Sequence, residues 1–300
     1  MGRKRKKSFG DPVDGILLLD KPAGITSNEA LQRARKLLGA RKAGHTGSLD
    51  PIATGLLPLC FGSSTRWSGY FLGSDKSYKA TVRLGETTET GDSEGAVTTR
   101  RPVNVSESHV CSILQEFVGT RLQIPPMYSA VKVDGQPLYK LARQGKEIAR
   151  EPREVTVHNL DFQSYDGRDI ELTLRCSSGF YVRTLATEIG ERLETGGHVI
   201  GLRRLGVAGL VVDQALTLDD LAKMPGSVER RACMGSVGEA LDHLPAVELS
   251  VDAAFYLCRG QSVRASNLPG EGSVRLYSSA TGFLGVGVVG PQGTVAPERL

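Results

Sequence analysis

Apolar positions along the chain follow two periodicities, one typical of buried strands and one typical of amphipathic helices. Short apolar runs and alternating stretches predict strands at 15–20, 56–61, 77–84, 153–162, 169–176 and 199–211. Apolar residues at helical spacing predict helices at 27–38, 107–117, 180–194 and 217–223. Because these elements alternate without a regular strand–helix–strand repeat, the pattern favours an α+β fold over a doubly wound parallel sheet.

The segments between these elements are also informative. Thr26 followed by Glu29 is a capping-box pattern that marks the start of the first helix. Residues 40–58 hold three glycines and two prolines without a sustained period, so we expect an ordered loop there. An acidic, threonine-rich turn is expected at 86–95 and a strand pair near 120–133.

The composition changes toward the C-terminus. After Leu244-Pro245 the chain becomes glycine-rich and strand-like, and the glycine run at 282–290 lacks the following helix that a dinucleotide-binding motif would need. The chain is therefore predicted to have three parts, a basic flexible arm at 1–12, a main body at 13–246 and a small β domain at 247–300.

The overall composition excludes several classes of protein. Of the 300 residues, 40% are hydrophobic and 23% are charged, which is enough to bury a core and keep a solvated surface. No apolar stretch approaches the roughly 18 residues of a membrane helix. The five cysteines have no short spacing, so they fit neither a disulfide framework nor a zinc site. We expect a cytoplasmic protein without a metal.

The charge is distributed unevenly. Five basic residues stand at positions 3–7, so the rest of the chain carries −1 of the net charge of +4. A clustered basic arm is the usual electrostatic footprint of a protein that binds phosphate backbones. The alternative for this arm is a solubilising tail.

The densest group of reactive residue types lies at 44–51, Gly-His-Thr-Gly-Ser-Leu-Asp-Pro. Pro51 biases Asp50 toward an extended backbone, and the glycines allow a ligand to approach the main chain closely. The Asp50 carboxylate is therefore presented from a loop, where catalytic groups are common. In the alternative interpretation, Asp50 only caps the turn and His45 only packs in the core.

Four stretches in the right order resemble the motifs of the TruB family of tRNA pseudouridine synthases. They are the opening strand and turn at 14–27, the aspartate motif at 44–51, the tyrosine segment at 74–79 and Ser-Gly-Phe-Tyr-Val-Arg-Thr-Leu at 178–185. The Leu-Arg-Arg that ends at residue 204 also matches. The similarity covers about residues 13–211 and is weaker in the C-terminal tail. Phe180 stands where the family pattern has threonine.

The resemblance implies both a fold and an activity. The fold is a mixed, mainly antiparallel sheet in an α+β body, followed by a small β-rich, PUA-like RNA-binding domain. The activity is isomerisation of uridine 55 in the T-arm of tRNA to pseudouridine. This reaction breaks the N1–C1′ bond, turns the base and rejoins it through C5. It needs neither a redox centre nor a metal, so we expect no cofactor.

The resemblance makes Asp50 the catalytic residue, acting either as a nucleophile at the sugar or as an acid/base. Because burial raises the pKa of a carboxylate, a nearby guanidinium would keep it ionised. We therefore hypothesise that Arg183 pairs with Asp50. Tyr181 is suited to move the C5 proton, since a phenol can both donate and accept.

A base inside structured RNA must leave its stack before an enzyme can reach it. The resemblance places Tyr78 and Tyr181 on the two sides of the extruded base and Leu202 against the uracil. His45 would fill or brace the vacated stack. Taken without the family motifs, Tyr78, His45 and Leu202 are better interpreted as core residues.

Several basic residues are candidates for contacts with RNA phosphates. Lys42 and Arg66 lie near the aspartate motif, together with Arg41. Lys132 lies in a predicted hairpin and short helix at 129–146 that resembles an RNA-facing segment of the family. The arginines at 203–204 either reach phosphates or stay solvated.

The sequence thus predicts a cofactor-free isomerase that acts on tRNA as a monomer, without a membrane. The alternative is a non-catalytic tRNA-binding chaperone of the same fold, which flips the base and releases it unchanged. Asp50 and Tyr181 together count against a chaperone, because such a protein needs no nucleophile. A glycoside hydrolase would need a second acid, and the sequence marks none.

Overall fold

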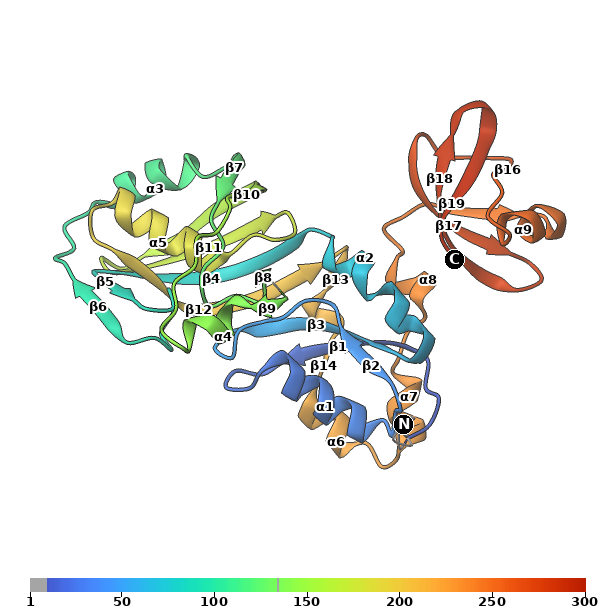
Figure 1. The fold of residues 1–300 in the computed structure, drawn as a ribbon, viewed down its shortest axis with the longest axis horizontal. Helices are drawn as coiled ribbons and strands as arrows, with labels where there is room; N and C mark the ends of the chain where they lie inside the picture. The colour runs from blue at the N-terminus through green and yellow to red at the C-terminus, as the bar shows by residue number, and fades with distance from the viewer. Residues whose placement is uncertain (1–9, 134) are drawn as a thin grey trace. The chain divides into compact units, whose positions relative to one another are not determined.

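The computed structural model of the chain describes residues 10–133 and 135–300 (Figure 1). The predicted basic arm at 1–12 therefore falls largely outside the described residues. The chain divides into two compact units, one that ends at Cys233 and one that runs from Met234 to Leu300.

The first unit is built around one large mixed sheet. Ten strands of the described residues form it, in the order β14-β1-β3-β12-β4-β11-β10-β7, with β2 on β3 and β13 on β12. Their bounds are β1 (Gly15–Lys21), β2 (Ala43–His45), β3 (Thr54–Phe61), β4 (Lys76–Leu84), β7 (Gly119–Gln123), β10 (Arg153–Tyr165), β11 (Asp169–Cys176), β12 (Gly197–Val207), β13 (Leu210–Val211) and β14 (Leu216–Thr217). Neighbours are antiparallel except in the pairs β1–β14 and β3–β12. The predicted α+β fold with a mainly antiparallel sheet is confirmed.

Short helices and two separate hairpins complete the first unit. The helices are α1 (Ser27–Leu37), α2 (Ser68–Leu72), α3 (Glu107–Gln115), α4 (Leu138–Ala142), α5 (Val182–Arg192), α6 (Leu218–Lys223) and α7 (Ser227–Ala232), with 3-10 turns η1 (Gly62–Trp67) and η2 (Val212–Gln214). The hairpins pair β5 (Glu86–Thr88) with β6 (Val97–Arg100) and β8 (Lys132–Val133) with β9 (Gln136–Pro137).

The core of the first unit lies between the sheet and the helices α3 and α5, which Figure 1 shows on one side of it. Leu114 of α3 and Ile189 of α5 are fully buried there with Val82 of β4 and Leu172 of β11. Phe180, the departure from the family pattern, is buried in the same cluster. An apolar side chain at this position is therefore accommodated by packing.

Most of the predicted elements are present within a few residues of their expected bounds. The helix at 27–38 is α1, and the Thr26 side chain accepts a hydrogen bond from the backbone of Glu29, as the capping pattern predicts. The strand pair expected near 120–133 is wrong, because β7 pairs with β10 and β8 pairs with β9. The loop expected at 40–58 is shorter, since β2 pairs with β3 inside it.

The second unit is a small β domain. Five of its described strands form a sheet in the order β15-β17-β18-β19-β16. Their bounds are β15 (Ala246–Leu249), β16 (Val263–Arg264), β17 (Gly272–Ser278), β18 (Gly282–Gly290) and β19 (Thr294–Arg299), with α8 (Val237–Ala240), α9 (Val251–Leu257) and η3 (Pro291–Gly293). Leu257 of α9 packs with Val274 and Leu276 of β17 in its core.

The division between the units lies before the predicted boundary at 246–247. Arg275 of β17 donates hydrogen bonds to the carbonyls of Gly238 (2.9 Å) and Leu244 (2.8 Å). The segment that precedes the glycine-rich stretch is thereby fixed to the second unit, which composition could not reveal. Among the described residues, no helix is long and apolar enough to cross a membrane.

Candidate active site

The loop between β2 and β3 carries Asp50, and it is fixed on both sides of that residue. The Ser27 hydroxyl, at the start of α1, accepts a hydrogen bond from the Leu49 N–H (2.7 Å) and donates one to the Leu49 carbonyl (3.1 Å). On the other side, the Pro51 carbonyl accepts from the Gly24 N–H (2.8 Å). The turn of the motif at 14–27 therefore holds the loop of the aspartate motif at 44–51 in place.

Lys21 strengthens the same junction from the end of β1. Its side chain is fully buried, and its Nζ donates to the carbonyls of Pro22 and Ile25, both at 2.8 Å, and of Pro51 at 3.4 Å. Burial lowers the pKa of Lys21 to about 8, while the charge of Asp50 acts in the opposite direction. Lys21 therefore places a cation near Asp50 below that pH.

Asp50 forms the predicted ion pair with Arg183. Arg183 Nε lies 2.9 Å from Asp50 Oδ2, and Nη2 donates to Oδ1 at 3.3 Å. The Arg183 side chain is only 5% exposed, whereas that of Asp50 is 36% exposed. Further bonds to the carbonyls of Thr90 (3.0 Å) and Tyr128 (2.7 Å) fix the guanidinium. The result is an accessible carboxylate on a rigid, buried cation.

Asp92 is the second carboxylate at this guanidinium, and the sequence did not single it out. Its Oδ2 lies 3.6 Å from Arg183 Nη1, and its side chain is 3% exposed. Its Oδ1 accepts hydrogen bonds from the Thr90 hydroxyl and from the Glu94 N–H. The sequence indicates only an acidic, threonine-rich turn at 86–95. A hydrogen bond from the backbone N–H two residues further on to an aspartate side chain defines an Asx turn. This pattern identifies Asp92 as a residue that stabilises the turn.

The electrostatic surroundings decide how readily Asp50 ionises. Burial raises the pKa of Asp50 above the ordinary aspartate range, Arg183 lowers it, and the nearby charge of Asp92 raises it again. The net direction is upward. A more basic carboxylate is a better proton acceptor, but it is ionised only at a correspondingly higher pH.

Two tyrosines lie close enough to Asp50 for its charge to act on them. Tyr78 stands on β4, and Tyr181 precedes the first residue of α5, where its backbone N–H donates to Gln123 (2.8 Å) and its carbonyl accepts from the same amide (3.1 Å). Burial raises the pKa of both phenols, and the Asp50 charge adds to this in both. Both hydroxyls are therefore protonated at neutral pH.

His45 and Leu202 are both half-buried, and within the described residues neither forms a hydrogen bond with Asp50. His45, the last residue of β2, is half-buried, and its Nδ1 accepts a hydrogen bond from the Gly47 N–H at 3.4 Å. Burial, followed by the charge of Arg204, lowers the pKa of His45, so the ring is neutral at physiological pH. Leu202 of β12 is half-buried and packs against the main core, as Tyr78 does.

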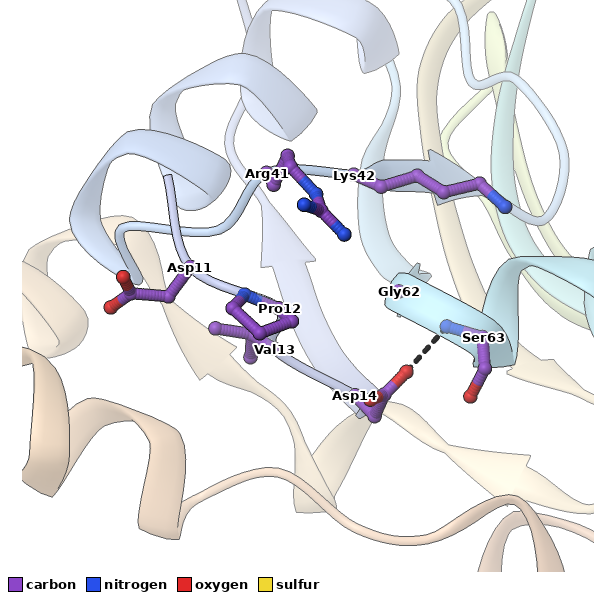
Figure 2. Close-up of a pocket in the computed structure, with 8 residues that line it drawn as sticks. All are labelled: Asp11, Pro12, Val13, Asp14, Arg41, Lys42, Gly62 and Ser63. Carbon is purple, nitrogen blue, oxygen red and sulfur yellow. Dashed lines mark hydrogen bonds between the residues drawn. The ribbon is translucent and has the colours of Figure 1, made fainter. Parts of the chain in front are cut away.

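The predicted phosphate contacts lie on separate exposed segments. Arg66 is exposed on η1 and Lys132 is exposed on β8. Lys42, which is also exposed, lines a cavity of about 320 Å³ whose lining residues also include Arg41, Asp11, Asp14 and Ser63. Figure 2 shows the two basic side chains on one side of this cavity and Asp14, hydrogen-bonded to Ser63, on the other.

Of the two arginines at 203–204, only Arg204 differs from what the sequence predicts. Arg203 pairs with Asp20 through two bonds, at 3.0 and 2.7 Å. Arg204 is 1% exposed, so neither a phosphate contact nor a solvated side chain describes it. Its side chain faces the interior, where it donates to the carbonyls of Leu56 and Gly47. Within the described residues, no group of three or more His, Cys, Asp or Glu side chains is suited to hold a metal ion.

Solved structures share this fold. The chain superposes on one in the "Crystal Structure of a Cbf5-Nop10-Gar1 Complex" with a TM-score of 0.73 at 23% identity, over 99% of this chain and 90% of that one. A second match, from the "Crystal structure of the archaeal box H/ACA sRNP Nop10-Cbf5 complex", has a TM-score of 0.69 at 21% identity, over 99% and 92%. At these identities the likeness shows the fold alone.

Sequence comparisons define the class. The model described as "TruB family pseudouridylate synthase (N terminal domain)" matches residues 35–182. Two models of the C-terminal domains of this synthase match 183–243 and 245–300. Relatives named "tRNA pseudouridine synthase B" are 50% identical in Methylobacillus flagellatus, over 96% of this chain and 95% of the relative, and 47% identical in Coxiella burnetii, over 98% and 96%.

The family models and the relatives define the chain as a pseudouridine synthase, which is an isomerase. Within that class, the chain belongs to the TruB family. The resemblance inferred from the four sequence motifs is confirmed.

Proposed function

We propose that the chain converts uridine 55 in the T-arm of tRNA to pseudouridine, with Asp50 as the catalytic carboxylate. The observation that carries this proposal is the geometry at Asp50, a partly exposed carboxylate fixed by a buried guanidinium near two protonated phenols. The printed names of relatives that are 47–50% identical over nearly the whole chain support tRNA as the substrate.

Asp50 acts in its ionised form, either by attack on C1′ or by acid/base assistance at the sugar. When the N1–C1′ bond breaks, its electron pair leaves with the base. The base turns, C5 bonds to C1′, and the proton lost from C5 is matched by one gained at N1. Tyr181, whose backbone is held by Gln123, relays the C5 proton: its protonated hydroxyl gives up its own proton, which supplies the one gained at N1, as its oxygen takes the proton from C5. Substrate and product are isomers, so this sequence of steps requires no oxidant or reductant.

Base flipping gives the remaining residues their roles. Tyr78 and Tyr181 flank the extruded uracil, and stacking offsets part of the few kcal/mol that extrusion costs. Leu202 contacts the base through its exposed part. His45, neutral because of burial and the nearby Arg204, braces the vacated stack without adding a charge.

Binding of the tRNA backbone is assigned to the exposed cations Lys42, Arg66 and Lys132. The second unit, which begins at Met234, before the predicted residue 247, is assigned the role of the PUA-like RNA-binding domain. It holds only four arginines, no lysine and six acidic residues, so it contributes shape and hydrogen bonds more than charge. The chain acts as a monomer in the cytoplasm, a setting that its free cysteines support.

The direct test is tritium release from a tRNA transcript labelled at C5 of uridine. The wild-type protein is expected to release one tritium per tRNA, and a transcript without uridine 55 is expected to release none. Asp50→Asn should abolish release and keep tRNA affinity within about 3-fold, since the change removes a charge and a nucleophile with little volume.

The matched control is Asp161→Asn, which alters an exposed carboxylate on β10 and should leave release unchanged. Tight tRNA binding without release by the wild-type protein would instead indicate the chaperone. Equal loss of binding and release in Asp50→Asn would indicate that Asp50 is structural.

A further inference from the structure

Arg204 is the largest polar side chain among the fully buried residues of the described chain, at 1% exposure. Its backbone lies between two strands, opposite Tyr78 of β4 on one side and opposite Gly55 of β3 on the other. Gly55 has a φ of +101°, and a Cβ there would lie 2.3 Å from the Arg204 carbonyl oxygen. The close approach of β3 therefore fixes the Arg204 backbone where the loop that carries Asp50 enters the sheet.

The Arg204 guanidinium connects three parts of the site. Its Nε donates to the Leu56 carbonyl on β3 at 2.7 Å, and its Nη2 donates to the Gly47 carbonyl at 3.2 Å. It also hydrogen bonds the side chain of Tyr78. One side chain thus holds β3, the aspartate loop and a phenol in fixed relation.

The charge of Arg204 has no carboxylate partner among the described residues, where its polar contacts are two carbonyls and a phenol. The same charge lowers the pKa of three neighbours, His45, Lys21 and Lys76. Burial of a cation without a counter-ion is costly, and an apolar side chain of similar volume would fold at lower cost. A role of the Arg204 charge in the reaction would explain why the chain keeps a buried cation at this position.

We propose that Arg204 is a positioning residue for the isomerisation, which fixes the Tyr78 hydroxyl and the Gly47 carbonyl and keeps a positive charge behind the phenol. This inference rests on the proposed function. A phenol oxygen that accepts a hydrogen bond from Arg204 keeps its single proton free to donate toward the substrate.

The hydrogen-bonded pair of Arg204 and Tyr78 would stabilise the uracil after it has separated from the sugar. Cleavage of N1–C1′ leaves the bonding electron pair on the uracil, and a donor backed by a fixed cation lowers the energy of that anion. The negative charge is consumed when C5 bonds to C1′ and the C5 proton is replaced by one at N1. Arg204 therefore acts on the transition state and has little effect on the binding of tRNA.

The experiment compares Arg204→Met, Arg204→Lys, Tyr78→Phe and the double variant Arg204→Met/Tyr78→Phe. Single-turnover rates with saturating tRNA are measured beside tRNA dissociation constants. Arg204→Met and Tyr78→Phe should each slow the rate by about 10- to 100-fold, with dissociation constants within about 3-fold of the wild type. The double variant should be no slower than the slower single variant, and Arg204→Lys should recover part of the rate.

The matched control is Arg83→Met, because Arg83 lies on β4 but is paired with Asp169 at 2.6 Å; its rate should equal that of the wild type. A wild-type rate in Tyr78→Phe would overturn the inference even if Arg204→Met failed to fold. Additive losses in the double variant would overturn it too, since they would make the two residues independent. A wild-type protein that forms no pseudouridine in tRNA would remove the proposed function, and this inference with it.

Discussion

The site contains two buried arginines whose positive charges have different kinds of partner. Arg183 lies beside two carboxylates, Asp50 at 2.9 Å and Asp92 at 3.6 Å. Arg204 has two carbonyls and a phenol instead. Both arginines are at most 5% exposed, so the difference lies in the partners and not in access to water.

The comparison shows how neighbouring residues of one site can supply both signs of charge. At Arg183 the cation is outnumbered by two carboxylates, and in the proposed mechanism Asp50 directs the surplus negative charge toward the sugar. At Arg204 the cation is in surplus, and in the proposed mechanism Tyr78 carries its effect to the base. A reaction that breaks a bond between sugar and base separates charge along the same line.

The largest effect on the reaction rate is expected from the loss of Arg183, the buried cation that is paired with carboxylates. Arg183→Met leaves Asp50 and Asp92 as neighbouring carboxylates, so we expect the single-turnover rate to fall by about 10²- to 10³-fold. Arg183 lowers the pKa of Asp50, so its loss should raise that pKa. The acidic limb of the pH–rate profile, below which Asp50 is protonated and inactive, should therefore move to higher pH. An unmoved limb would contradict the proposed pairing.

A smaller effect of opposite sign is expected from the second carboxylate. Asp92→Asn removes a negative charge that raises the pKa of Asp50, so the acidic limb should move to lower pH. The rate at neutral pH should fall by about 10-fold, because Arg183 loses one of its anchors. Asp169→Asn, at a carboxylate paired with Arg83, serves as the control. A shift in the same direction as that of Arg183→Met would disprove the assigned electrostatics.

The smallest effect is expected outside the pocket. Lys42→Ala and Lys132→Ala should each reduce the slope of log affinity against log salt by about 0.7 to 0.9, as expected for one lost phosphate contact. The rate at saturating tRNA should stay the same, because neither residue touches the reacting atoms. Lys223→Ala, at an exposed lysine of α6, is the control. Unchanged slopes for Lys42 and Lys132 would remove them from the RNA interface.

The sequence predicts those parts of the fold that depend on local periodicity and capping. Thr26 and the apolar positions that follow it are sufficient to identify α1, and the long apolar alternation identifies β4. Pairing partners are not local, so the partner of β7 was missed even though the strand itself was found. The segment before residue 246 shows the same limit, since the two bonds from Arg275 that fix it span 31 and 37 residues.

The site residues also fall into those that the sequence identifies and those that only the three-dimensional structure reveals. Asp50 and Arg183 could be paired from the sequence because family motifs and elementary electrostatics point to the same two residues. Asp92 was missed because an acidic turn does not show which of its carboxylates points inward. Arg204 was placed on the surface because arginine is usually exposed. Its burial and its bonds to the carbonyls of Leu56 and Gly47, which no local pattern reveals, show that its side chain enters the core.

Gly55 shows how narrow the tolerance of this arrangement is. One methyl group at this position would occupy the space of the Arg204 main chain. Relief of that overlap would require the two strands to separate, and Asp50 and Arg204 would move apart with them. If the proposed mechanism holds, the alignment of two opposite charges across a single glycosidic bond depends on a hydrogen atom where every other amino acid has carbon.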